Sequence, residues 1–388
     1  MERISEMMMN LISNEVCGKV IDSENLRLTD DDLKQLYILS KKHDLAHLVG
    51  DALIRHKLLS DGEIKSKFEK QMMTAFYRYE RINYELNSLS ETLNQAQIPF
   101  IPLKGSVLRQ YYPKPWMRTG CDIDILVHDA DLDRAVKLLT GHLKYRVESE
   151  QSHDIGMYSP SGVHLELHYT LIESNIVGKA DEVLKEVWEQ SAPGQDCLYR
   201  YVMSEEMFYY YHIAHMAKHF QNGGCGARPL LDLWILNHKI VYDAEKRNAL
   251  LEEGGLMKFA GTARQLSEVW FGNLGHNAIT KKVERYILCG GVYGTMNNRV
   301  AVQQIRRGGK LRYAISRIWL PYDTLKCHYP SLEGKRVLLP FYEARRWGKL
   351  VFCGGAKRGV RELKLNSAMT KAEQLRTNEI LSHLGLEN

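Results

Sequence analysis

The chain of 388 residues lacks the features that mark secreted and membrane-spanning proteins. No apolar run is long enough to cross a lipid bilayer. The N-terminal segment contains acidic residues and has no basic stretch followed by an apolar one, so it does not resemble a secretory signal. We therefore expect the protein to stay in the cytoplasm.

Cysteine is sparse, and its spacing excludes two ways of stabilising a small fold. There are 7 cysteines, an odd number, and they form no CxxC pair. This pattern is typical of reduced intracellular thiols and indicates neither a disulfide framework nor a structural zinc site. The chain also lacks internal repeats and low-complexity segments.

The composition is that of an ordinary globular protein, but the charge is unevenly distributed. Hydrophobic residues make up 44% and charged residues 26%, which excludes a largely disordered chain. The net charge is +5; residues 301–388 hold 17 Lys and Arg against 7 Asp and Glu, a local +10, so the first 300 residues carry −5.

The basic C-terminal region is consistent with contacts to nucleic acid or to an anionic membrane surface, or with a simply solvated surface. Two stretches, 305–319 and 341–351, mix cations with aromatic residues. Neither contains a sequence-reading nucleic-acid motif or a clean amphipathic period. The sequence leaves all of these interpretations open, and it does not predict the oligomeric state.

Hydrophobic spacing predicts a mainly helical chain that contains one small mixed β-sheet, an α+β fold. Residues 1–97 have helical spacing, most clearly in a helix ending near Gln97, whose apolar face carries Ile82, Leu86, Leu89 and Leu93. Residues 98–175 form the sheet region. Residues 176–284 are helical again, and residues 285–388 form the basic C-terminal region.

Within residues 98–175 the pattern changes to short apolar runs separated by turn residues. The run that starts at Ile98 ends in the turn Lys104–Ser106, after which a helix is expected over 107–112. A second strand is expected over 121–127. Turn chemistry at Ser159–Gly162 predicts a hairpin. Further strands are expected at 145–148, 155–158 and 163–169.

Asp122 and Asp124 are two apart on the second of these strands, so both side chains point to one face, while Ile123 and Ile125 point to the other. Carboxylates held close together are costly unless a cation or a proton relieves them. Hard oxygen ligands suit Mg²⁺, which binds a few carboxylates together with substrate phosphates. The alternative is that this face is solvated.

Three further features favour a site. Glu166 lies in a later alternating strand and faces the same way as His164 and His168, so it can meet the two aspartates. Lys104, Gly105 and Ser106 form a strand-to-helix turn of the kind that holds phosphates through backbone N–H groups. Arg118 precedes the strand that carries Asp122.

This arrangement resembles the uncharacterised bacterial nucleotidyltransferase family of the polymerase-beta-like superfamily. The shared pattern is a Gly-Ser turn, an apolar-flanked D-x-D and a third acid on a later strand, here Gly105–Ser106, Asp122–Asp124 and Glu166. The resemblance covers roughly residues 76–240. One departure is Cys121, which stands where the family has a glycine, with Gly120 displaced by one position.

The resemblance implies a polymerase-beta-like core and a role for each acid. Asp122 and Asp124 would bind two Mg²⁺ ions, for which Mn²⁺ can substitute, and Glu166 would complete the metal site and accept a proton from the attacking hydroxyl. Gly105 and Ser106 would contact the phosphates of an NTP. The acceptor would carry a hydroxyl and could be a small molecule, a saccharide, a peptide or a protein.

Three cations are candidates for the triphosphate. Lys104 and Arg118 either bind triphosphate charge or are surface cations whose apolar stems pack on the fold. Lys218 lies in a segment that resembles the helical part of the same family, His215–His219 followed by an Asp-Leu helix. In related enzymes such a helix supplies a triphosphate-binding lysine, and Lys218 is the candidate here.

His212, His215 and His219 share a helical face. The pair His215 and His219, at i, i+4, has a spacing that zinc can use, but no third ligand and no HExxH motif is apparent. Hydrogen-bonded histidines packed between helices are the favoured interpretation.

Two functions stay open for the chain as a whole. It is an active enzyme that moves a nucleoside monophosphate from an NTP, or an inactive nucleotide-binding or partner-binding module on the same fold.

Overall fold

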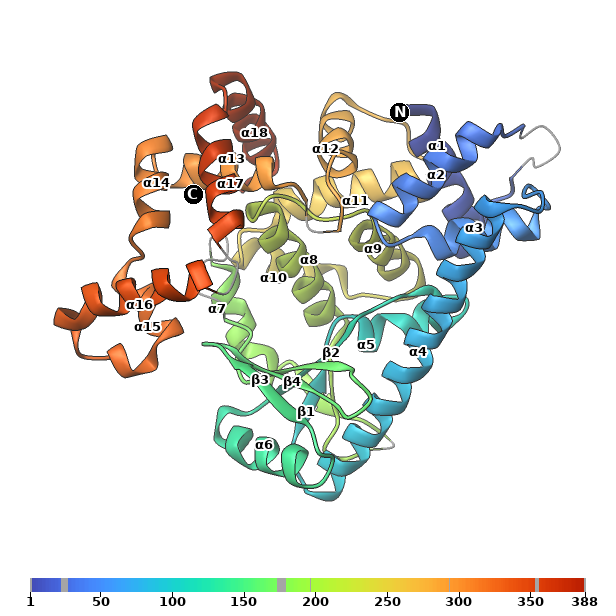
Figure 1. The fold of residues 1–388 in the computed structure, drawn as a ribbon. Helices are drawn as coiled ribbons and strands as arrows, with labels where there is room; N and C mark the ends of the chain where they lie inside the picture. The colour runs from blue at the N-terminus through green and yellow to red at the C-terminus, as the bar shows by residue number, and fades with distance from the viewer. Residues whose placement is uncertain are drawn as a thin grey trace.

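The computed structural model describes residues 2–21, 27–172, 179–195, 197–292, 294–352 and 356–386. Within them, a mixed sheet has the strand order β1-β2-β5-β4-β3 and lies in a mainly helical chain, which confirms the predicted α+β fold (Figure 1). Its strands are β1 (Phe100–Pro102), β2 (Asp122–Val127), β3 (Arg146–Glu150), β4 (Asp154–Tyr158) and β5 (His164–His168).

Strand direction follows from the connections. β4 and β5 pair antiparallel across the turn that begins at Ser159, where Gly162 has a φ of +83°, a conformation that glycine adopts without a steric penalty. β2 and β5 pair in parallel, while β1–β2 and β3–β4 are antiparallel. The predicted strands and hairpin of this region are confirmed, with bounds shifted by one or two residues.

The two faces of the sheet differ in chemistry. One face carries isoleucine and leucine side chains that alternate along β2 and β5, and these pack against α4 (Glu63–Gln95) and α6 (Leu132–Gly141). Ile82, Leu86, Leu89 and Leu93 of α4 are buried in this contact, as their spacing predicts. The other face carries polar side chains and is turned toward the helices that follow the sheet.

The segment after β1 differs from its expected form. A helix was expected over 107–112, but the helix α5 begins at Gly105 and ends at Leu108, and a 3₁₀ turn (Arg109–Tyr111) continues it. The helical character expected here is confirmed, but the helix begins two residues earlier, because Lys104 adopts φ 46° and ψ −120° and the chain turns sharply one residue before Gly105. Such a backbone conformation is unfavourable for a residue with a Cβ atom.

A large helical assembly encloses the polar face. Helices from before the sheet and after it share one apolar core, which joins α1 to α11 and buries aromatic residues such as Tyr210 and Phe220. Ser204 caps the helix α8 (Glu205–Gln221) by accepting a hydrogen bond from the backbone N–H of Met207. The helices before the sheet are α1 (Glu2–Ile12), which continues into a π-helical segment (Ser13–Cys17), α2 (Asp30–Lys42) and α3 (Ala46–Arg55). Those after it are α7 (Ala180–Leu184), α8 (Glu205–Gln221), α9 (Arg228–Lys239), α10 (Ala244–Glu253), α11 (Met257–Phe271) and α12 (Ala278–Leu288), with the short strands β6 (Ser191–Pro193) and β7 (Tyr201–Met203).

The basic C-terminal region is helical and forms two small apolar clusters of its own. One surrounds Tyr313 and the other surrounds Tyr342. Figure 1 shows α14, α15 and α16 projecting at the edge of the molecule, away from the sheet. The helices are α13 (Met296–Arg306), α14 (Lys310–Ile318), α15 (Tyr322–His328), α16 (Leu339–Phe352), α17 (Ala356–Ala368) and α18 (Lys371–His383). Across the described ranges, no helix combines the length and the apolar composition that a membrane crossing requires.

Candidate nucleotidyl-transfer site

The parallel pair β2–β5 brings the predicted acids together. Asp124 lies opposite Glu166 in the register, and Asp122 lies opposite His164. Side chains at paired positions of neighbouring strands point to the same face, so the three carboxylates share the polar face of the sheet. The sequence predicted this convergence from the alternation of the strands alone.

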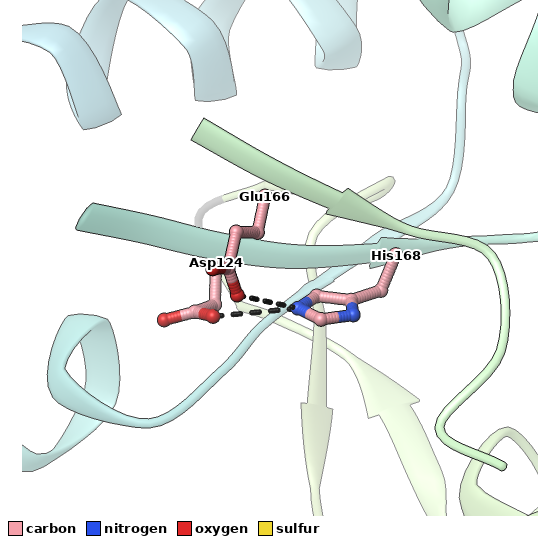
Figure 2. Close-up of side chains that lie close together, drawn as sticks. All are labelled: Asp124, Glu166 and His168. Atoms are coloured by element: carbon pink, nitrogen blue, oxygen red, sulfur yellow. Dashed lines mark hydrogen bonds and ion pairs between the residues drawn. The ribbon is translucent and has the colours of Figure 1, made fainter. Parts of the chain in front are cut away.

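His168 joins Asp124 and Glu166 in the tightest cluster of this face. Its Nε2 atom lies 3.3 Å from Asp124 Oδ1 and 3.4 Å from Glu166 Oε2. Figure 2 shows the imidazole ring directed toward both carboxylates. The three residues offer ligand atoms that all lie within 4.8 Å of one another, so they could hold a metal ion. The sequence placed His168 on the correct face but assigned it no role, although its two-residue spacing from Glu166 carried the signal.

Lys104 supplies the positive charge of this cluster. Its Nζ atom lies 2.6 Å from Asp124 Oδ1 and 3.6 Å from Glu166 Oε2. Burial by itself lowers the pKa of Lys104, but the charge of Asp124, supported by Glu166, raises that pKa well above its usual range. Asp124 is only 3% exposed; burial opposes its ionisation, yet the Lys104 ammonium holds its pKa well below the usual range.

Asp122 has a different environment from Asp124. Burial, followed by the neighbouring charge of Asp124, raises the pKa of Asp122. Among the residues that the structure describes, none donates a hydrogen bond or forms an ion pair with its carboxylate. A partly buried carboxylate next to a second one, without a cation of its own, is suited to binding a positively charged group.

The acids face a cavity of about 270 Å³ between the sheet and helices α8 and α9. Asp122, Asp124 and Glu166 line the sheet side. His215, Lys218 and Arg228 line the opposite side. Negative and positive side chains therefore face each other across one cavity, which is a suitable arrangement for a ligand that brings both phosphates and cations.

Arg118 lines the same cavity but is held by a carboxylate on α9. Its Nε atom donates to Asp232 Oδ1 at 2.8 Å, and the Tyr112 hydroxyl donates to the same oxygen at 2.7 Å. Arg118 and Asp232 are both buried, which excludes the interpretation of Arg118 as a surface cation. This contact between the segment before β2 and α9 comes from tertiary packing, because Asp232 is far from Arg118 in the sequence.

The turn at Gly105 is packed closely against Arg118. A Cβ atom at Gly105 would lie 3.2 Å from Arg118 Nη1, so a side chain there would crowd the guanidinium. The Ser106 hydroxyl is buried and has no hydrogen-bond partner among the described residues. The contacts of Gly105 and Ser106 with phosphates stay predictions.

The histidines of α8 do not form a three-ligand cluster in the part of the chain that the structure describes. His212 Nε2 lies 3.0 Å from the Pro229 carbonyl oxygen, and the Nε2 atoms of His215 and His219 lie 3.3 Å apart. Burial, and then the positive charges nearby, lower the pKa of His215 well below its usual range, so its ring is neutral. These contacts are those of packed, hydrogen-bonded histidines.

Residues 29–272 match the model of a family described as an uncharacterised nucleotidyltransferase. This chain belongs to that nucleotidyltransferase family. The matched range contains the sheet, all three acids and helices α8 and α9, which build the cavity, whereas the helices from α12 onward lie outside it. No curated protein and no solved structure matches the chain.

The Arg118–Asp232 pair gives the first testable prediction for this nucleotidyltransferase. The substitution Asp232→Asn removes one charge of a buried ion pair and leaves the Arg118 guanidinium uncompensated. We expect the free energy of unfolding to fall by about 3–5 kcal/mol. Urea denaturation followed by circular dichroism measures this change. Asp133→Asn, at an exposed position of α6, is the matched control and should change stability by less than about 0.5 kcal/mol. Equal stability of the two variants would contradict the structural role of Asp232.

Proposed function

We propose that this chain is an active enzyme that transfers a nucleoside monophosphate from an NTP to the hydroxyl of an acceptor. One observation carries the proposal: three carboxylates from two neighbouring strands face Lys218 and Arg228 across one cavity, in a chain of a nucleotidyltransferase family. The carboxylates suit divalent cations, and the lysine and arginine suit the phosphates that such cations accompany.

The residues present fit a divalent cation. Asp122, Asp124 and Glu166 provide the hard oxygen ligands that Mg²⁺ and Mn²⁺ prefer, and the imidazole nitrogen of His168 is more favourable for Mn²⁺. The Asp122 carboxylate lacks a hydrogen-bond or ion-pair partner among the described residues, which supports a cation at this position. Bound divalent cations would neutralise phosphate charge and stabilise the attacking and leaving oxygens of the transfer.

The residues of the chain then have separate tasks. The oxygen of the acceptor hydroxyl attacks the α-phosphorus, and the bond from this phosphorus to the bridging oxygen breaks, so that pyrophosphate leaves with the bonding electrons. The hydroxyl proton passes to the carboxylate of Glu166, whose side chain is 29% exposed and lines the cavity. Lys218 and Arg228 hold the triphosphate from the helical side. Positioning and charge neutralisation provide most of the rate enhancement in such chemistry.

Lys104 has a specific part in this proposal. Its ammonium group contacts the same oxygens of Asp124 and Glu166 that would hold a divalent cation. Lys104 and a cation therefore compete for these oxygens, and Lys104 must leave them when the cation binds. Since the side chain is long and the cavity is adjacent, the released ammonium can reach the triphosphate.

The position of the Lys104 ammonium between Asp124 and Glu166 also favours a second function. If the Lys104 ammonium stays between Asp124 and Glu166, it replaces the divalent cation, and the chain is an inactive module that binds a nucleotide or a partner. Asp122 favours the enzyme, because its carboxylate has no ion-pair partner among the described residues, whereas Asp124 and Glu166 pair with Lys104 in either case. The two functions differ in whether pyrophosphate is released.

The proposed activity predicts a Mg²⁺-dependent release of pyrophosphate from at least one of the four NTPs. Replacing both Asp122 and Asp124 by Asn removes two anionic ligands, and we expect the rate to fall by at least about a hundredfold. A coupled pyrophosphatase assay measures the rate, and a thermal-shift screen identifies the NTP that binds the native state. Glu150→Gln, at an exposed position of β3, is the control and should retain the wild-type rate. Wild-type release from the double variant would refute the site.

The competition between Lys104 and a cation predicts the behaviour of Lys104→Met. This substitution keeps the apolar stem and removes the ammonium group. In the wild type, Mn²⁺ must first displace the Lys104 ammonium from Asp124 and Glu166. If this displacement costs ~1.4 kcal/mol, its removal in the variant makes Mn²⁺ binding about tenfold tighter. Electron paramagnetic resonance of free Mn²⁺ measures the affinity without any NTP. Lys137→Met, exposed on α6, should leave the affinity unchanged. Weaker Mn²⁺ binding by Lys104→Met would show that Lys104 does not compete for the site.

A further inference from the structure

Helix α14 presents an apolar stripe to solvent. Leu311, Ile315 and Ile318 are spaced by four and three residues, so they lie on one face of the helix. Their exposed fractions are 75%, 55% and 47%, and Trp319, which follows the helix, is 48% exposed. Together these four residues form what we call the α14 stripe.

The opposite face of α14 anchors the helix to the rest of the protein. Tyr313 is buried in a small core with Val300, Ala301 and Met369, and Arg317 Nη2 lies 3.0 Å from Glu362 Oε2 on α17. The helix is therefore held in place by its other side, and the α14 stripe is not needed for this packing.

Helix α16 continues the surface at one end of the stripe. Trp347 Nε1 donates to the Ile318 carbonyl oxygen at 3.0 Å, and Arg346 Nη2 donates to the same oxygen at 2.8 Å. An indole that is 37% exposed thus lies beside the last turn of α14. Figure 1 shows both helices at the edge of the molecule, where an extended surface can approach them.

The segment of the chain that contains α14 and α16 is basic. Residues 310–350 contain 9 Lys and Arg and 3 Asp and Glu, a net charge of +6. Arg312 of α14 and Arg345 and Lys349 of α16 are exposed. One of the three acids, Glu343, is buried and accepts hydrogen bonds from the Leu320 N–H and from Arg346, so it adds little negative charge to the surface.

The sequence did not reveal this apolar stripe, because two glycines interrupt the helical conformation just before α14. Taken as one stretch, residues 305–319 lack a clean amphipathic period. The structure divides them at Gly308 and Gly309, whose φ angles of 72° and 123° end α13 and set a new direction for α14. The period holds for α14 alone, and the expectation of a stretch without amphipathic character was wrong for residues 310–318.

We propose that the α14 stripe and the adjacent end of α16 bind the surface of an anionic lipid bilayer. Leucine, isoleucine and tryptophan side chains would enter the boundary between headgroups and acyl chains, while the surrounding arginines and lysines contact anionic headgroups. A nucleic acid matches the charge but offers no apolar layer for the aliphatic residues. The surface lies outside the matched range 29–272, so this proposal does not depend on the proposed activity.

The test measures co-sedimentation of the full chain with lipid vesicles. Wild-type protein should bind vesicles of phosphatidylcholine mixed with phosphatidylglycerol, bind those of phosphatidylcholine alone more weakly, and be released by added salt. The double variant Leu311→Ser, Ile315→Ser should bind the anionic vesicles at least about tenfold more weakly, because it removes two exposed aliphatic side chains. Arg312→Gln should weaken binding to a smaller extent.

The matched control is Ile38→Ser on α2, which is 66% exposed and should bind as the wild type does. All variants should melt at the wild-type temperature, because the replaced side chains lie at the surface. Absence of binding to anionic vesicles, or equal binding of the wild type and the double variant, would overturn the proposal. The proposal would also be overturned if the wild type were a dimer and the double variant a monomer. The same holds if duplex DNA bound the protein and prevented it from binding the vesicles.

Discussion

The burial of like charges on the parallel strand pair β2–β5 is the constraint on which the rest of the structure depends. Asp122, Asp124 and Glu166 lie on one face, and Asp124 is almost fully buried. Carboxylates so placed are destabilising unless cations accompany them. Lys104 meets this need for Asp124 and Glu166, and its unusual backbone conformation brings its ammonium to them. The strained backbone at Lys104 is thus accompanied by ion pairs between its side chain and the buried acids of the sheet.

The sheet can carry these charges because the other face of β2 and β5 is apolar. The isoleucines and leucines that alternate with the acids pack against α4 and α6, and their burial offsets the cost of a charged face. The same alternation therefore serves stability and function. A shift of register by a single residue would bury the acids against α4 and expose the apolar side chains, so the register is strongly specified.

A second charge network joins the sheet region to the helices behind the cavity. Asp232 of α9 holds Arg118 and Tyr112, and Arg228 Nη1 of the same helix lies 2.9 Å from Asp44 Oδ2 near the end of α2. These contacts connect three parts of the chain around one cavity. They fix the distance between the acids on the sheet and the cations on the helices, and an enzyme that positions a triphosphate requires such a fixed distance.

The sequence by itself determined the fold class, the common face of Asp122, Asp124 and Glu166, and the apolar stripe of α4. Each of these depends on the period of a strand or a helix, which is a local property. Only the tertiary structure decided the partners of the charges. Asp232 captures Arg118, Lys104 turns toward Asp124, and His168 joins the acids, because these contacts depend on how distant segments pack. The glycine break before α14 likewise hid an amphipathic helix, since the period is visible only after the bounds of the helix are known.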